Sequence, residues 1–243
     1  MEIVRDGRTA LYYQIYDMLR EKIEDGEYLP GDQIPTELEL SSQLNVSRIT
    51  VKKAIQKLVV EGLLYRVQGK GTFVSGPRVN RKLNSLLSFH DEMMQRGIMA
   101  TTKLLELSAA EARSKVAVAL RIPEGSRVIR VKRIRLGDGS VMAVQTSYIA
   151  YSRCPGLLDC EALLTGSLYK VLRENFALDP VRGVERYSVT VVDGQDAVLL
   201  DVPSGTAAFA VTRVAYVADG SVLEYAESLL RADKFTLDVE LVR

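Results

Sequence analysis

The sequence predicts an α+β protein with two parts, an N-terminal winged helix-turn-helix and a C-terminal α/β domain built on an antiparallel sheet. Three observations predict this fold class. Residues 1–75 contain helical patterns joined by a tight turn and followed by a glycine-tipped hairpin pattern. Residues 84–243 consist of alternating strand patterns with a few helices and contain an internal repeat. Residues 76–83 combine glycine, proline and basic residues and form the expected linker.

Composition excludes several functional classes. The chain has 243 residues, of which 47% are hydrophobic and 26% are charged, as in ordinary folded proteins. It contains no apolar run of about 18 residues, and residues 1–11 lack the apolar core of a secretory signal, so we expect a cytoplasmic protein. Cys154, Cys160 and the single histidine, His90, give almost no material for a disulfide framework, a metal site or a Ser-His-Asp triad. No metal, cofactor or catalytic residue is therefore expected.

The first part begins with an expected amphipathic helix over residues 11–25. Its apolar residues repeat every four positions: Leu11, Ile15, Leu19 and Ile23. Thr36 and Glu39 have the spacing of a capping box. A second, short helix is therefore expected to begin there and to end near Leu44.

A third helix is expected after a tight turn, with Ser47 as its cap. Its predicted buried face consists of Val51, Ala54, Ile55 and Leu58. Residues 64–67 and 72–74 can pair as strands around a glycine-rich tip at Gly69. Two helices joined by a short turn and followed by a hairpin are the outline of a winged helix-turn-helix.

Charge is distributed unevenly over this part. Residues 41–78 carry seven basic residues and one acidic residue, whereas residues 21–40 carry seven acidic residues and one basic residue. The positive charge falls on the third helix and the hairpin, which are the elements that would face DNA phosphates. The alternative is an ordinary solvated helix face.

The second part contains a repeat, because residues 120–126 match residues 200–206. Each copy is followed by a strand pattern, an Asp-Gly turn and another strand pattern, which is a strong hairpin signal. A helix is expected before each hairpin, over residues 109–120 with Ser108 as its cap and near residues 195–200. Two related hairpins predict one antiparallel sheet with pseudo-twofold character. The repeat is either a folding unit only or the frame of a ligand cleft between two halves.

The chain also resembles a known family. Three segments resemble the DNA-binding domain of the GntR family of bacterial transcription regulators: residues 30–40 (PGDQIPTELEL), 46–54 (VSRITVKKA) and 69–74 (GKGTFV). Residues 83–243 are similar to the UTRA effector domain of the HutC subfamily, which shares its fold with chorismate lyase. The residues that carry this second resemblance are 88–89, 133–135, 146–149, 166–169 and 223–225. The resemblance implies a regulator, expected to be a repressor, that is controlled by a small and frequently anionic metabolite.

The third helix is expected to enter the major groove of a palindromic operator, bound by a homodimer. Arg48 is the expected base-reading residue, because a guanidinium can bind guanine O6 and N7 together, and the resemblance points to the same residue. Further DNA contacts are expected at Ser47, Thr50, Lys52, Gln68, Gly69 and Lys70. The family often has arginine at the position of Leu38, so one base or phosphate contact is missing here.

The effector is expected to be an anion. Arg133 and Arg135 alternate on one expected strand and therefore face the same side, where they would clamp a phosphate or a carboxylate. The alternative is an exposed strand face paired with acidic residues. Ser167 and Tyr169 lie in a turn at a helix start, which favours an anion. Other ligand contacts are expected at Phe89, His90, Gln145 and Glu224.

The resemblance leaves the effector class open between a phosphosugar, an amino-sugar phosphate and a carboxylate. Sugar-phosphate sensors of the family often carry glutamate at the position of Gln145 and tyrosine at the position of Leu230. A hydroxyl residue commonly stands at the position of His90. These departures weaken the sugar-phosphate assignment and leave the anion clamp intact.

Two other functions stay open at this point. One is an enzyme similar to chorismate lyase, in which the arginines would hold a carboxylated substrate, although no nucleophile–base pair stands out. The other is a constitutive DNA-binding protein whose C-terminal domain only dimerises.

Overall fold

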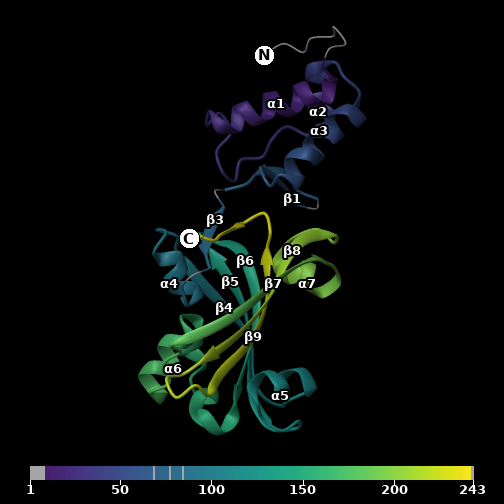
Figure 1. The fold of residues 1–243 in the computed structure, drawn as a ribbon. Coiled ribbons are helices and arrows are strands. Elements are labelled where there is room, and N and C mark those ends of the chain that lie inside the picture. Colours follow the sequence, from purple (N-terminus) through teal and green to yellow (C-terminus); the bar gives the residue numbers. More distant parts are fainter. Residues whose placement is uncertain (1–8, 68, 77, 84, 242–243) are drawn as a thin grey trace. The chain divides into compact units, whose positions relative to one another are not determined.

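The computed structural model describes residues 9–67, 69–76, 78–83 and 85–241 of the chain (Figure 1). The chain forms two compact units. The first unit ends at Arg78 and also includes Ala232–Lys234, whereas the second comprises Val79–Arg231 and the residues from Phe235 onward. The division therefore lies inside the segment that was expected to be a linker.

Three helices and a hairpin make up the first unit, which confirms the winged helix-turn-helix. They are α1 (Leu11–Glu24), α2 (Glu37–Leu44), α3 (Arg48–Val60), β1 (Leu64–Val67) and β2 (Gly71–Val74). The predicted capping box is present, since Thr36 Oγ1 accepts from the amide of Glu39 at 3.3 Å and the Glu39 carboxylate accepts from the amide of Thr36 at 2.7 Å. Asn45, with φ of 50°, makes the turn between α2 and α3.

The core of this unit is formed by the apolar stripes of α1 and α3. Its fully buried members include Ile15, Leu19, Val51, Ala54, Ile55, Leu58 and Leu64. The four residues predicted for the buried face of α3 all belong to this set. The remaining face of α3 is thereby left open to solvent.

The second unit is built on one six-stranded antiparallel sheet with the order β4-β5-β6-β9-β8-β7. The strands are β4 (Ala100–Glu111), β5 (Arg127–Gly137), β6 (Ser140–Ala150), β7 (Arg182–Val192), β8 (Thr206–Tyr216) and β9 (Val222–Arg231). Each half of the sheet is one copy of the repeat, and the halves meet where β6 pairs with β9. The pseudo-twofold sheet expected from the sequence is thus confirmed.

Each copy also contains a helix between its first two strands, namely α5 (Ser114–Leu120) and α7 (Gly194–Leu200). The expected helix over residues 109–120 is wrong in its first half. Strand β4 continues to Glu111, which pairs with Arg127 of β5. The ladder with β5 uses the backbone groups that a helix would need, and Ser108 Oγ donates to Glu106 rather than capping a helix.

The two faces of the sheet carry different helices. Ile129 and Val131 of β5 pack with α6 (Leu168–Phe176) and with the short 3₁₀ turns before it (Tyr151–Arg153, Pro155–Asp159 and Glu161–Thr165). Ile134, on the opposite face, packs with α7. Because side chains alternate along a strand, the odd-numbered residues of β5 that follow Val131 lie on the α6 face.

The segment expected as a linker is partly ordered as a strand. β3 (Val79–Lys82) pairs in parallel with β10 (Phe235–Asp238). A short helix, α4 (Phe89–Met94), follows it and is capped by Ser88, whose Oγ accepts from the amide of Asp91 at 3.2 Å. In the part of the chain that the structure describes, no helix is both long enough and apolar enough to cross a membrane.

Candidate functional site

Arg48, the expected base reader, is the first residue of α3, and its side chain is 68% exposed. Its Nε lies 3.5 Å from a carboxylate oxygen of Glu37 on α2. The same carboxylate accepts from Arg66 Nη2 of β1 at 3.1 Å. An exposed ion pair of this kind contributes about 0–1 kcal/mol, so a phosphate or a base edge can replace Glu37 as the partner.

The hydroxyl residues beside Arg48 are engaged at the start of α3. Ser47 Oγ accepts from the amide of Thr50 at 3.2 Å, and the two side-chain hydroxyls hydrogen-bond to each other at 2.7 Å. Lys52 is exposed. Sequence reasoning missed Ile49, which is 81% exposed between these residues and is available for apolar contact with a thymine methyl group.

The hairpin tip has the conformation that its glycines predict. Gly69 has a φ of 74°, and no atom lies within 4 Å of the position that a Cβ would occupy. The carbonyl oxygen of Lys70 accepts from Gln33 Nε2 at 3.0 Å, which ties the tip to the rest of the unit, while the Lys70 side chain is exposed. Gln68 lies outside the described residues.

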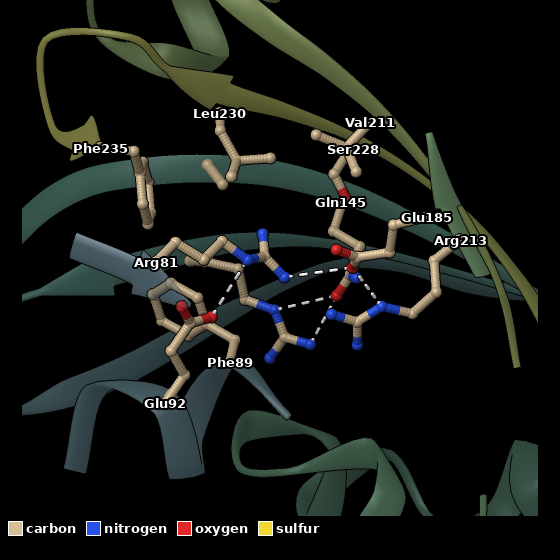
Figure 2. A pocket seen from close by; sticks show the side chains of 12 residues that line it. Arg81, Phe89, Glu92, Gln145, Glu185, Val211, Arg213, Ser228, Leu230 and Phe235 are labelled. Carbon is tan, nitrogen blue, oxygen red and sulfur yellow. Dashed lines mark hydrogen bonds and ion pairs between the residues drawn. The ribbon is translucent and has the colours of Figure 1, made fainter. Parts of the chain in front are cut away.

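A pocket of about 460 Å³, part of it open to solvent, lies in the second unit where the two halves of the sheet meet (Figure 2). The β6–β9 pairs Ala143–Leu230 and Gln145–Ser228 form its floor. The full lining consists of Arg81, Phe89, Glu92, Arg135, Ala143, Gln145, Glu185, Val211, Arg213, Ser228, Leu230 and Phe235. Three arginines and two glutamates therefore face one space together with an apolar wall.

Arg133 and Arg135 lie next to each other on the same face of β5 and are almost completely buried, with 1% and 5% exposure. Arg135 donates to Thr102 Oγ1 at 2.9 Å and to Gln145 Oε1 at 2.7 Å. Arg133 makes only long contacts, to Gln145 Oε1 at 3.3 Å and Ser147 Oγ at 3.4 Å. Among the described residues, its buried Nε and Nη1 have no hydrogen-bond partner, and Arg133 lies outside the pocket lining, beside Arg135.

Neither of these two arginines has a carboxylate within 4 Å among the residues that the structure describes. Burial lowers the pKa of Arg133 from its ordinary value to about 10, although the charges of Glu224 and Tyr169 act to raise it. Burial, followed by the charge of Arg133, lowers the pKa of Arg135 well below its ordinary value. A buried charge without a counterion is costly, so this pair forms an electropositive site that a bound anion would stabilise.

Gln145 lines the pocket, as expected of a ligand residue, and also contacts both arginines. Its Oε1 accepts from both arginines and therefore orients them. Tyr169 donates to Glu224 at 2.7 Å, and Arg213 Nη1 donates to the Tyr169 hydroxyl at 3.4 Å. Tyr169 and Glu224 are buried and bonded to each other, and neither lines the pocket itself.

Other expected ligand residues divide between the pocket and its surroundings. Phe89 lines the pocket, and Arg135 lies 5.7 Å from the centre of its ring. Ser167 caps α6 by accepting from the amide of Lys170 at 3.3 Å, and it lies outside the lining. His90 is half-buried on α4 and is not part of the lining either.

Sequence reasoning missed four charged residues of the pocket: Arg81, Glu92, Glu185 and Arg213. The repeat contains the signal for one of them, because Arg213 stands at the position equivalent to Arg133. Arg81 was expected to be a linker cation, and the sequence holds no local signal for the two glutamates. The described residues include no cluster of three His, Cys, Asp or Glu that could hold a metal ion.

Comparisons with known proteins agree with this architecture. Residues 11–74 match the family model of bacterial regulatory proteins of the gntR family, and residues 95–236 match the UTRA domain. The HTH-type transcriptional repressor NagR of Bacillus subtilis is 30% identical over 236 residues, which cover 97% of this chain and 96% of that protein. The probable fructoselysine utilization operon transcriptional repressor of Escherichia coli is 32% identical over 237 residues, with 97% and 96% covered.

Among solved structures, the crystal structure of PhnF from Mycobacterium smegmatis superimposes with a TM-score of 0.64 at 25% identity and covers 94% of this chain and 99% of that one. The match therefore includes both the winged helix-turn-helix and the antiparallel-sheet unit. Together, these matches and the two units on which they fall establish that the chain belongs to the GntR family of bacterial transcription regulators and carries a UTRA domain.

Proposed function

We propose that this protein is a transcription repressor that binds a palindromic operator as a homodimer and is controlled by a small anionic metabolite held in the pocket of its UTRA domain. The observation that carries the anionic effector is the buried pair Arg133 and Arg135, which has no carboxylate partner among the described residues. The relatives named as repressors support the direction of regulation.

The arginines that line the pocket, and Arg133 beside it, differ in how their charge is compensated. Arg213 has Glu185 at 2.6 Å, and Arg81 has Glu185 at 3.2 Å and Glu92 at 3.5 Å. These arginines are neutralised by the protein, whereas Arg133 and Arg135 are held only by neutral oxygens. A phosphate or carboxylate would supply the missing charge and could accept from guanidinium nitrogens that now have no partner.

The class of effector remains a phosphosugar, an amino-sugar phosphate or a carboxylate. Phe89, Leu230 and Phe235 give the pocket an apolar side, which suits the body of a ligand that is not wholly polar. Gln145 uses its carbonyl oxygen on the arginines, so it is not free to accept from a ligand hydroxyl. Both features favour a carboxylate with an apolar body over a sugar phosphate.

The proposal for DNA rests on the exposed N-terminal face of α3. Arg48, Lys52 and Lys70 are all solvent-exposed, and Arg48 is held only by a weak exposed ion pair. A dimer places two such helices on matching half-sites, which is why a palindromic operator is expected. The enzyme alternative is not proposed, because the relatives are regulators and no observation in the pocket favours catalysis.

A thermal-shift screen tests the effector proposal. The panel contains sugar phosphates, amino-sugar phosphates and small carboxylates, each with its neutral analogue, at constant ionic strength. We expect anions to stabilise the protein and neutral analogues to fail. Arg133→Ala and Arg135→Ala should each weaken binding at least about tenfold, since a charge-assisted contact contributes about 1.5–3 kcal/mol.

Arg186→Ala is the matched control, because Arg186 is exposed on β7 and outside the pocket lining. Wild-type affinity in both pocket variants would place the effector elsewhere. Wild-type affinity in only one of them would leave a site with a single arginine, which favours a monocarboxylate over a phosphate.

A further inference from the structure

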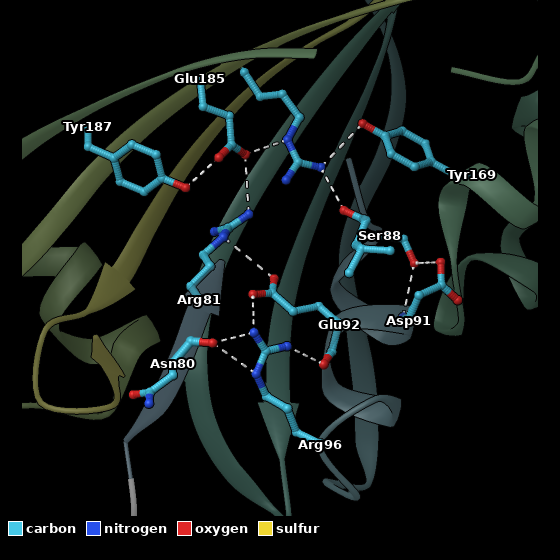
Figure 3. Close-up of polar contacts among 11 residues, drawn as sticks. Asn80, Arg81, Ser88, Asp91, Glu92, Arg96, Tyr169, Glu185 and Tyr187 are labelled. Carbon is cyan, nitrogen blue, oxygen red and sulfur yellow. Dashed lines mark hydrogen bonds and ion pairs between the residues drawn. The ribbon is translucent and has the colours of Figure 1, made fainter. Parts of the chain in front are cut away.

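Arg81 joins three elements around the pocket. It projects from β3, and its side chain is only 12% exposed. Its Nη2 donates to Glu185 of β7 at 3.2 Å, and its Nε lies 3.5 Å from Glu92 of α4 (Figure 3). We refer to Arg81 with Glu92 and Glu185 as the Arg81 bridge.

Both carboxylates of the Arg81 bridge are shared with other cations. Glu185 Oε1 also accepts from Arg213 Nε at 2.6 Å, and Glu185 accepts from the Tyr187 hydroxyl. Burial raises the pKa of Glu185, but the charges of Arg213 and Arg81 outweigh this and lower it below its usual value. Glu185 is therefore ionised at neutral pH, and two guanidiniums compete for one of its oxygens.

The second carboxylate, Glu92, lies between Arg81 and Arg96, whose Nη2 is 3.5 Å away. Arg96 Nε also donates to the backbone carbonyl of Asn80, the residue of β3 next to Arg81, at 3.1 Å. β3 is thus held at two successive residues, by its backbone at Asn80 to the turn that follows α4 and by the side chain of Arg81 to α4 itself (Figure 3).

We propose that Arg81 is a further residue of the effector site. Glu92 and Glu185 hold the Arg81 side chain while the pocket is empty, and the side chain moves toward an anion that binds beside Arg135. The contacts that hold β3 in place therefore change when the pocket is occupied. This inference rests on the proposed anionic effector. It assigns to Arg81 a ligand contact and a positioning role that the linker assignment did not give it.

The electrostatics of the pocket support such an exchange. Arg81, Arg135 and Arg213 face the same space as Glu92 and Glu185. An anion that enters this space repels the two carboxylates and attracts the guanidiniums, and these forces are strong because the side chains are largely removed from water. A side chain with two alternative partners, one from the protein and one from the ligand, is an element whose equilibrium the ligand can bias.

The position of β3 in the chain gives this exchange a consequence. β3 begins at Val79, directly after Arg78, where the first unit ends. Its partner β10 begins at Phe235, directly after Lys234, the last residue of the second segment of the first unit. The chain connections between the DNA-binding unit and the UTRA domain therefore lead into the β3–β10 pair. A change at Arg81 acts on the strand that follows the DNA-binding unit.

The first test measures the affinity of inorganic phosphate by titration calorimetry at constant ionic strength. Glu185→Gln should raise the affinity by at least about threefold, because it removes a competing charge and frees Arg81 and Arg213 for the anion. Arg81→Gln should lower it by at least about threefold, and Arg81→Lys should restore part of the loss. If the bridge were merely structural, both the Glu185 and the Arg81 variants should lose affinity for phosphate.

The matched controls are Glu106→Gln and Arg130→Gln, which break an ion pair between β4 and β5 outside the pocket and should leave the affinity unchanged. If neither wild type nor Glu185→Gln binds phosphate, this inference is refuted, and the thermal-shift screen with carboxylates decides separately whether the anionic effector site stands. If wild type binds and Glu185→Gln binds equally or more weakly, only the role of the Arg81 bridge is refuted.

The second test is amide hydrogen exchange of residues 79–82 in the full chain, with and without saturating phosphate. Wild type should exchange faster in β3 when phosphate is bound, because Arg81 has left its carboxylates, and Arg81→Gln should show no phosphate-dependent change. An unchanged β3 in wild type, or the same change in the variant, would overturn the coupling to β3.

Discussion

Arg133 and Arg213 occupy equivalent positions in the two halves of the repeat, yet replacing them with methionine should change stability in opposite directions. Arg133 is 1% exposed and has two guanidinium nitrogens without partners. Burial lowers its pKa to about 10, and the shift from the ordinary arginine value corresponds to about 3 kcal/mol of penalty for the charged form in the folded state. The guanidinium is charged in both the folded and the unfolded chain at pH 7, so the full penalty is present there, and it declines only as the pH rises above 10 toward the ordinary arginine pKa.

Arg133→Met removes this penalty and also loses two long hydrogen bonds, which contribute at most about 1 kcal/mol each. The free energy of unfolding should therefore rise by about 1–3 kcal/mol in the absence of anions. This increase corresponds to a melting temperature several degrees higher. Arg213→Met instead removes the partner of Glu185 at 2.6 Å and leaves that carboxylate with Arg81 at 3.2 Å, so the free energy of unfolding should fall by about 1.5–3 kcal/mol.

Urea unfolding at pH 7 in chloride buffer measures both values, with tyrosine fluorescence and circular dichroism as probes. Addition of phosphate should then stabilise wild type more than Arg133→Met, because the variant keeps only Arg135 of the pair. An Arg133→Met protein that is less stable than wild type without anions would show that the charge of Arg133 is already compensated, and it would refute the reasoning behind the anion site.

Four further substitutions each change a single charged residue. Arg48→Ala should cost about 1–3 kcal/mol of operator binding and relax specificity at one base position. Lys70→Ala should instead weaken binding to all DNA sequences alike and reduce the slope of log affinity against log salt concentration by about one. Anisotropy titrations on a selected operator and its single-base variants measure both effects. Glu37→Gln should strengthen operator binding by up to about 1 kcal/mol in the same assay, because it releases Arg48 and Arg66 from their shared carboxylate. An unchanged operator affinity would show that this contact does not compete with DNA. Glu185 has a lowered pKa, so its contribution to stability is complete above its ordinary value of 4.5 and is lost as the pH falls through the lowered value. When unfolding is measured between pH 6 and pH 3, the free energy of unfolding should therefore fall less steeply for Glu185→Gln than for wild type. Parallel pH dependences of the two proteins would contradict this.

The local signals in the first unit were sufficient to predict its fold. The capping box at Thr36 and the apolar stripe of α3 involve residues within one or two helical turns, and the structure contains both as expected. The Asp-Gly turns predicted the two hairpins of the second unit for the same reason. Elements whose determinants lie close together in the chain could thus be predicted from sequence.

The sequence-based predictions were wrong or incomplete where residues far apart in the chain determine the local structure. Ser108 and Glu111 have capping spacing, but pairing with β5 overrides it and keeps them in β4. β3 has no local strand signal, because the partner that orders it, β10, lies more than 150 residues further along the chain. Within the pocket, strand alternation predicted the shared face of the two arginines of β5. Arg81 and Glu185 are brought to the same pocket only by the tertiary fold.

We propose that occupation of the arginine pocket by an anion changes the affinity for DNA. An anisotropy titration of a selected operator tests this claim, with wild type and Arg135→Ala, with and without the anion that stabilises wild type most, at constant ionic strength. The two proteins should bind the operator equally without the anion, since Arg135 lies outside the DNA-binding unit. With the anion, the operator affinity of wild type should change by at least about tenfold, while that of the variant stays within about twofold. An equal response of the two proteins, or no response of wild type, would contradict the claim.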